Sequence, residues 1–309
     1  AASVLLVLPI RADVQDQVDW PSFLARHDLV WEAPPRVWHE GAFIGNGLLG
    51  SMIYSPDGKS LQWDIGRSDV SFRGGRIAIG RFAFAGATND LRGDMRLDLW
   101  NAEARGACRS GGRSWTWRSY VHAKELFTLI ETEGDAPDLT FTAEPARPAR
   151  LVHKKEPIPP DLTNPDGEGG MTGEIHWWRQ PYKGGGGHVV AWASHSLPGN
   201  RRQHLSSVDY VLAGEVTVDR AVAQVRLAQK SLPEALEKSH RAWWQACWPR
   251  SFLSIPDARM ESFYWIQMYK LAAGTRSDRP ALDLMGPWFR STPWPMIWWN
   301  LNIQLTYWP

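Results

Sequence analysis

The sequence lacks the features that mark several common classes of protein. Its 309 residues hold only 2 cysteines, Cys108 and Cys247. Such a pair excludes a disulfide framework and a cysteine-rich metal site, although a single bridge stays open. The formal net charge is +1 and the 34 basic residues are scattered. This charge pattern favours neither a nucleic acid nor a membrane as a partner.

Several catalytic and ligand motifs are also missing. No G-x-S-x-G nucleophile elbow occurs, which argues against acyl transfer. The 9 histidines form no H-x-x-x-H or H-E-x-x-H pair, so we interpret them as packing or capping residues and expect no metal and no cofactor. The polar loop Asp161–Glu168 fails the spacing of a calcium loop. Gly45, Gly47 and Gly50 match G-x-G-x-x-G, but a hairpin follows them, which indicates a tight turn instead of a nucleotide site.

Most of the chain has the pattern of antiparallel strands. From about Asp19 to Gln229, short runs alternate polar and apolar residues with period two. Pro56-Asp57-Gly58 predicts the turn of one hairpin. The segment from Pro145 to Gly187 is rich in proline and glycine, and we expect a long or lid-like loop there. Asp64 is interpreted as a turn or loop residue that could line a cleft.

Helical spacing replaces this pattern after Ser231. We predict one helix over 232–247 with Ser231 as its N-cap, and a second helix capped by Asp257 that runs to about Ala273. The second helix is apolar almost all round, so other elements must cover it. A third helix begins close to Pro309, and we therefore expect a helical domain of which this chain holds only the start.

The first residues, from Ser3 to Ile10, form an apolar run that is too short to cross a bilayer, which needs about 20 residues. It resembles the end of a secretory signal, which would place the protein outside the cytoplasm, in the periplasm or secreted. A buried first strand is the alternative. No later run reaches membrane-spanning length.

Tryptophan is unusually abundant, with 19 residues in the chain. Aromatic walls with projecting amides suit a sugar, whose flat faces stack on rings while its hydroxyls pair with polar groups. The C-terminal end combines both features, so we predict an oligosaccharide or polysaccharide as the binding partner. An aromatic helix junction without a ligand is the alternative. The predicted substrate-binding residues are Trp288, Trp294, Trp298, Trp299, Gln304 and Tyr307.

Two segments resemble glycoside hydrolase family 95. WHEGAFIGNGLLGSMIYSPDGKSLQWD is similar to the start of that family's N-terminal domain, and NLNIQLTYWP behind a G-x-W is similar to part of its barrel. The resemblance implies a mainly β protein: a large antiparallel β-sandwich followed by the first helices of an incomplete (α/α)6 barrel. The expected divisions are a signal remnant (1–12), the sandwich (13–230), a linker helix (231–256) and the start of the catalytic barrel (257–309).

Members of that family are inverting α-L-fucosidases and α-L-galactosidases. The resemblance implies that Asn300 and Asn302 hold and orient the attacking water, while the general acid and base come from later in the barrel. This chain alone is then expected to be inactive. Met285 stands where the family often has glutamine, which puts the sugar preference in doubt. An inverting sugar phosphorylase and a non-catalytic carbohydrate-binding or structural sandwich are the alternatives.

Overall fold

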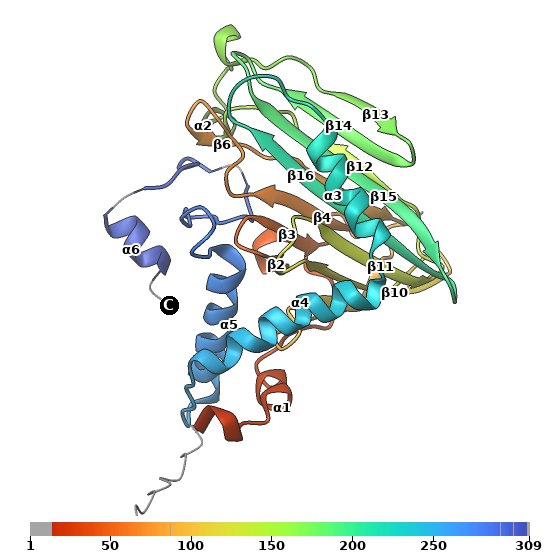
Figure 1. The fold of residues 1–309 in the computed structure, drawn as a ribbon, viewed down its shortest axis with the longest axis vertical. Helices are drawn as coiled ribbons and strands as arrows, with labels where there is room; N and C mark the ends of the chain where they lie inside the picture. Colours follow the sequence, from red (N-terminus) through yellow and green to blue (C-terminus); the bar gives the residue numbers. More distant parts are fainter. Residues whose placement is uncertain (1–13, 87, 291, 299, 308–309) are drawn as a thin grey trace, which may run out of the picture.

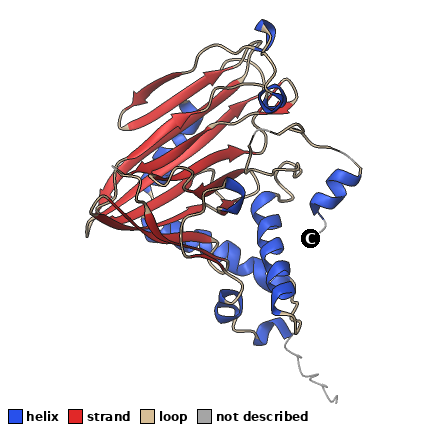
Figure 2. Cartoon of the chain, turned by 180° about the vertical axis from the view of Figure 1, so that it is seen from behind, coloured by secondary structure: helices blue, strands red, loops and turns tan. Residues whose placement is uncertain are grey.

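The computed structural model describes residues 14–86, 88–290, 292–298 and 300–307. Two antiparallel β-sheets packed face to face dominate it, and several helices gather at one end of the sheets (Figures 1 and 2). The predicted class, a mainly β protein with a large antiparallel sandwich, is confirmed. The expected signal remnant, residues 1–12, lies outside the described part of the chain.

The larger sheet has nine strands, and every neighbouring pair in it is antiparallel. In spatial order the strands are β1 (Leu29–Trp31), β8 (Arg92–Asp98), β9 (Glu103–Ser110), β10 (Arg113–Val121), β11 (Thr128–Gly134), β16 (Arg201–Val211), β15 (Gly187–Leu197), β14 (Ile175–Pro181) and β13 (Glu168–Thr172).

The smaller sheet has five strands, also antiparallel. Its spatial order is β12 (Leu139–Ala143), β7 (Gly80–Ala85), β4 (Ser60–Arg67), β3 (Leu49–Tyr54) and β2 (Ala42–Gly45), and a separate hairpin joins β5 (Ser71–Phe72) to β6 (Gly75–Arg76).

Alternating side chains of the two sheets form the core. Trp63 of β4 is fully buried and meets Trp117 of β10 edge to face, with ring centroids 5.2 Å apart. Leu61 and Ile65 point to the same side as Trp63, while Gln62 and Asp64 point to the other. The period-two pattern of this strand therefore buries its apolar face between the sheets.

Local turn chemistry sets the hairpins as predicted. Asp57 Oδ1 accepts hydrogen bonds from the backbone N–H of Lys59 and Ser60, both at 2.9 Å, and Gly58 has φ +69°. In the G-x-G-x-x-G segment, Asn46 Oδ1 accepts from the N–H of Leu49 at 2.9 Å, and strand β3 follows instead of a helix. The dinucleotide interpretation fails for that reason.

Helix α3 covers the outer face of the nine-stranded sheet, and most other helices lie at one end of the sandwich (Figure 1). Helix α3 packs on β16, β15 and β14 of the nine-stranded sheet, and α5 contacts β2 of the five-stranded sheet. The helices are α1 (Trp20–Ala25), α2 (Ala149–Lys154), α3 (Asp219–Lys230), α4 (Pro233–Cys247), α5 (Ala258–Gly274) and α6 (Leu301–Tyr307), with short 3₁₀ helices η1 (Val14–Gln17), η2 (Trp38–Glu40), η3 (Pro160–Leu162) and η4 (Trp248–Arg250).

An aromatic cluster joins α1, α4 and α5. Trp265 is fully buried and meets Trp20 and Phe23 edge to face, at 5.7 and 5.4 Å between centroids. Its indole N–H donates to the backbone oxygen of Leu253 at 3.2 Å, so burial leaves no unpaired donor there. A substantial share of the tryptophan enrichment is therefore core packing and not a sugar-binding wall.

Three local expectations were wrong. Residues 219–230 form helix α3 instead of continuing the strands, because Ala221, Val222 and Val225 share one helix face that packs on the large sheet. Ser231 follows α3 as its C-cap, and the N-cap of α4 is Leu232. The segment from Pro145 to Gly187 is not one loop, since it contains α2, η3, β13 and β14.

Other expectations hold among the described residues. Asp257 accepts hydrogen bonds from the N–H of Arg259 and Met260 and caps α5. Cys108 and Cys247 are both free thiols, so the single disulfide bridge that the sequence left open does not form between them. Within the described ranges, no helix combines the length and apolar character needed to cross a bilayer.

Candidate functional site

A mostly buried carboxyl on the outer face of the five-stranded sheet, Asp64, lies in a cluster of titratable groups. Tyr54 Oη donates to Asp64 Oδ2 at 2.8 Å, and Gln62 Nε2 donates to Asp64 Oδ1 at 3.0 Å. The guanidinium of Arg290 contacts the same Oδ2. Beside them, Arg81 pairs with Glu144 at 2.5 Å. We call these residues the Asp64 cluster: Tyr54, Gln62, Asp64, Arg81, Glu144 and Arg290.

Strand pairing brings these groups together. Gln62 and Asp64 lie two residues apart on β4 and so share a face, and Gln62 is the cross-strand partner of Tyr54 on β3. Arg81 of β7 is the partner of Asp64 on the other side. Arg290 arrives from far along the chain, in the segment that follows α5. Asp64 is therefore a strand residue, and its interpretation as a turn or loop residue was wrong.

Burial raises the pKa of Asp64 to about 7, with Arg81 opposing the shift, Glu144 adding to it and the Gln62 hydrogen bond opposing it. The Arg290 guanidinium also favours the ionised carboxylate. Burial lowers the pKa of Arg290 as well. A carboxyl that titrates near neutrality can donate or accept a proton at physiological pH.

A hollow of about 460 Å³ lies beside this carboxyl, within the usual size of a small-molecule site. Lys59, Arg81 and Arg290 line it together with Tyr54 and Gln62. Such a lining can pair with hydroxyl groups or with an anion. Over the described ranges, no three His, Cys, Asp or Glu side chains gather closely enough to hold a metal ion.

The predicted binding residue Trp288 is buried at the junction of the sheet and α5. Its indole N–H donates to the backbone oxygen of Ile44 at 2.8 Å, and its ring meets Phe43 edge to face at 5.3 Å. Gly50 permits the close approach of this segment, because a Cβ there would lie 2.8 Å from Pro287 Cβ and 3.0 Å from Trp288 Nε1. Trp288 thus packs against the sandwich, and a role in binding stays a prediction.

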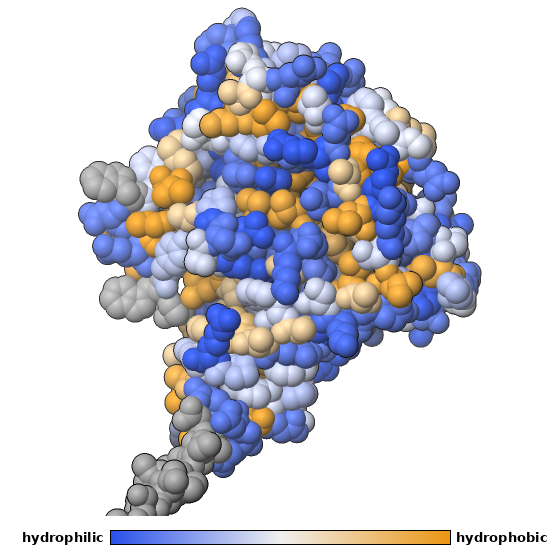
Figure 3. All heavy atoms as spheres, viewed as in Figure 1, coloured by the Kyte–Doolittle hydropathy of each residue, from blue (hydrophilic) through white to orange (hydrophobic). Residues whose placement is uncertain are grey.

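The next predicted residues are more exposed. Trp294 is 48 % exposed, and its ring lies 5.8 Å from that of the half-buried Trp298. Trp299 lies outside the described residues. In the region of α6, Figure 3 shows hydrophobic residues at the surface.

The two asparagines lie where α6 begins. Asn300 is exposed, has φ +63°, and accepts the N–H of Gln304 at 3.1 Å through its backbone oxygen. Asn302 is half-buried in the first turn of α6. Gln304 is exposed, and Tyr307 Oη accepts the N–H of Leu282 at 2.6 Å. The predicted residues therefore lie in three places: the sheet junction, the 294–298 loop and α6.

Sequence reasoning missed Tyr54, Arg81 and Arg290, because it treated the basic residues only as scattered charges. Alternation along β4 and β7 could have placed Gln62, Asp64 and Arg81 on one outer face. No local pattern could have brought Arg290 to them, since contacts after α5 decide its position.

Comparison with known proteins identifies the fold. No protein-family model matches the chain, and no curated protein matches it. Among solved structures, one named "Putative kojibiose phosphorylase from human microbiome" matches with a TM-score of 0.51 and 10 % identity. The match covers 79 % of this chain and 38 % of that one. The likeness shows that this chain shares the fold of part of that structure. The more specific resemblance to family 95 stays a prediction.

Proposed function

We propose that this chain is part of a glycoside-processing enzyme of the sandwich-plus-barrel kind. The likeness to the phosphorylase structure over 79 % of the chain is the observation that carries this proposal. The substrate class follows from it: an oligosaccharide or polysaccharide. The residues after α5 dock on the sheet through Arg290 and Trp288.

The first candidate reaction is inverting hydrolysis of an α-L-fucoside-like or α-L-galactoside-like bond. An inverting enzyme places water on the face opposite the leaving group and needs a general acid and a general base. Asparagine cannot take the proton at neutral pH, but its amide oxygen can accept a hydrogen bond from the water and orient it. In this proposal Asn300 and Asn302 orient the water and a separate carboxylate receives its proton.

The second candidate reaction is phosphorolysis, in which phosphate replaces water. Two observations favour it: the matching structure is named as a phosphorylase, and Lys59, Arg81 and Arg290 line one hollow. Arg81 and Arg290 are already paired with Glu144 and Asp64. Phosphate would have to compete with these carboxylates.

A location outside the cytoplasm remains part of the proposal for either reaction.

A product assay tests the proposal. We expect the 309-residue chain to hydrolyse neither p-nitrophenyl α-L-fucoside nor the α-L-galactoside, because loss of general acid or base assistance each forfeits about 10²–10⁴ in rate. The polypeptide encoded by the whole reading frame should release sugar in water or sugar 1-phosphate in phosphate buffer. Robust turnover by the 309 residues alone would contradict the assignment of the catalytic carboxylates. The proposed function would be overturned if the folded polypeptide of the whole reading frame cleaved no glycoside.

The asparagines can be tested separately in that longer polypeptide. Asn300→Gly keeps the left-handed backbone while removing the amide, and Asn302→Ala removes the second amide. Either change should lower kcat by about 10²-fold or more with little change in KM, if orientation of the nucleophile matters mainly in the transition state.

Asn200→Gly is the matched control, since Asn200 is also exposed with φ +55°, in the turn between β15 and β16. It should leave kcat unchanged. Melting temperatures of all three variants separate stability from chemistry. Activity per folded molecule that stays at the wild-type level in both Asn300→Gly and Asn302→Ala would remove the asparagines from the mechanism.

A further inference from the structure

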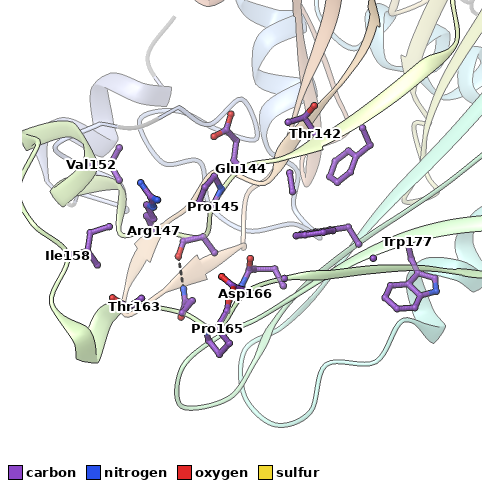
Figure 4. A pocket seen from close by; sticks show the side chains of 18 of the residues that line it. Thr142, Glu144, Pro145, Arg147, Val152, Ile158, Thr163, Pro165, Asp166 and Trp177 are labelled. Carbon is purple, nitrogen blue, oxygen red and sulfur yellow. Dashed lines mark hydrogen bonds between the residues drawn. The ribbon is translucent and has the colours of Figure 1, made fainter.

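A large cavity lies at the open edge of the sandwich, where the nine-stranded sheet is wider than the five-stranded one. Phe141 of the edge strand β12 packs on Trp192 of β15, at 4.8 Å between ring centroids, so β14 and β13 extend beyond β12. A groove of about 1390 Å³ fills this overhang (Figure 4). It exceeds the roughly 300–1,000 Å³ of ordinary small-molecule sites and has room for a chain of units.

Aromatic rings form the floor of this groove. Trp192 is held by Phe141 and Phe82 and stacks on the exposed His176, with the two ring planes 13° apart. His176 and Trp192 are cross-strand partners and therefore share one face of the sheet. Together they make a flat surface of the kind on which the C–H face of a sugar can stack.

Glycines shape the strand that borders this floor. A Cβ on Gly167 would lie 2.4 Å from Trp178 Cζ2, and one on Gly170 would lie 2.4 Å from Trp177 Cζ2. The indoles of β14 therefore lie directly against the backbone of residues 167–170, at the start of β13. This packing explains the glycine-rich sequence there without any need for flexibility.

The end of the opposite wall (residues 144–166) is hydrogen-bonded to β14 and to the residue Lys183 that follows it. Asn164 Nδ2 donates to the oxygen of Ala146 at 2.7 Å, and Asn164 Oδ1 accepts the N–H of Lys183 at 2.9 Å. Gln180 Nε2 donates to the oxygen of Pro165 at 2.8 Å. In Figure 4, Val152 and Ile158 lie on the α2 side of the groove and Trp177 on the sheet side. A preformed wall reduces the entropy lost when a ligand binds.

The charges of the lining favour an uncharged ligand. Three acidic side chains (Glu144, Glu156 and Asp166) and two basic ones (Arg147 and Lys155) line the groove, a difference of one charge. Arg147 and Asp166 are exposed and can pair with hydroxyl groups. An acyl chain would desolvate these charges without pairing them.

The groove also adjoins the Asp64 cluster. Thr142 lines both the groove and the hollow beside Asp64, and Glu144 lines the groove while pairing with Arg81 of the hollow. A chain held in the groove can therefore reach the edge of the hollow across β12.

From these observations we propose that the groove between α2 and strands β13–β15 binds a neutral oligosaccharide chain, with Trp192 and His176 as the stacking surface. The site is separate from the predicted C-terminal binding residues. The choice of a glycan as ligand rests on the proposed function, but the binding itself requires no catalysis.

Blocking the groove provides the test. Val152 is 40 % exposed on α2 and lines the groove, so Val152→Arg adds bulk there without removing a core side chain. Leu227→Arg is the matched control, since Leu227 is 53 % exposed on α3, which packs on the opposite face of the nine-stranded sheet. Maltohexaose, cellohexaose and a fucosylated xyloglucan oligosaccharide are titrated into the 309-residue protein by calorimetry.

We expect saturable millimolar or tighter binding of at least one of these glycans, weakened about tenfold or more by Val152→Arg, which corresponds to about 1.4 kcal/mol, and unchanged by Leu227→Arg. His176→Ala should weaken it too, with the melting temperature retained. The proposal is overturned if none of the three glycans binds, if Val152→Arg binds as wild type, or if both arginine variants lose binding equally. Glycan binding without turnover by the longer polypeptide would support the groove as a binding site and reject the proposed enzyme function. Turnover without glycan binding in the groove would support the enzyme function and reject the binding site.

Discussion

Replacing Asp283 with alanine is expected to lower the free energy of unfolding by about 3–5 kcal/mol, because it leaves a buried guanidinium unpaired. Asp283 Oδ2 accepts a hydrogen bond from Arg76 Nη1 at 2.8 Å, and each side chain is 5 % exposed. Arg76 Nη1 also donates to the oxygen of Gly286, and Asp283 Oδ1 accepts the N–H of Gly286. The pair thus fastens the segment before Trp288 to the sandwich. Guanidinium denaturation measures the change.

An exposed ion pair supplies the control. Asp138 is 90 % exposed in its side chain and pairs with Arg202 at 2.8 Å, so Asp138→Ala should cost less than about 1 kcal/mol. The double variant Arg76→Met with Asp283→Leu should recover most of the loss, because it removes both buried charges. Equal effects of Asp283→Ala and Asp138→Ala would show that the buried pair does not hold the segment.

Acidification from pH 7 towards pH 4.5 is expected to destabilise the protein steeply through four buried histidines. Burial lowers the pKa of His122 and His204 to about 4, and that of His188 and His240 to about 3. In the unfolded chain histidine binds a proton near pH 6.5. The stability that these neutral histidines contribute is fully present above about pH 6.5. It is lost as the pH falls towards their pKa values in the folded protein. Each histidine then contributes about 1.4 kcal/mol per pH unit.

His240 shows why the neutral form is required. Its Nδ1 accepts the N–H of Ala123 at 3.1 Å, so Nε2 carries the hydrogen and donates to the oxygen of Asn101 at 3.0 Å. The ring also stacks on Tyr120, with centroids 4.3 Å apart. Protonating Nδ1 would place two N–H groups against each other and bury a charge. His240 links α4 to the sheet, so its protonation would break this contact.

The slope of stability against pH measures this effect. His240→Gln should lower the slope of the unfolding free energy between pH 6.5 and pH 4.5 by about 1.4 kcal/mol per pH unit, which corresponds to one proton. It should also lower the stability at pH 7. His153→Gln changes an exposed residue and serves as the control. If wild type and His240→Gln have the same slope, His240 does not titrate as described.

Elements with strong local signals were predictable from the sequence. The Asp57-Gly58 turn and the Asp257 cap each act through hydrogen bonds within three residues, so their chemistry is visible locally. Alternation along β4 likewise reflects a face that must be buried. Helix α3 was missed although Ala221, Val222, Val225 and Ala228 follow a helical period, because valine-rich sequence before it continued the strand pattern.

The roles of the tryptophans and of Asp64 depended on tertiary structure. An indole is suited both to a core and to a sugar-binding wall, so its sequence position does not show its role. The packing role of Trp288 became visible only from the hydrogen bond of its indole N–H to the distant backbone oxygen of Ile44. The sequence alone led to the interpretation of Asp64 as a polar turn or loop residue, whereas it lies in β4. Its pKa near 7 results from burial, and Arg290, which reaches it from 226 positions away, completes the cluster. The sequence by itself determined a mainly β chain with helices towards its end, because backbone patterns are local. Which side chains share a site was decided by packing between segments far apart, because solvation and charge depend on everything nearby in space.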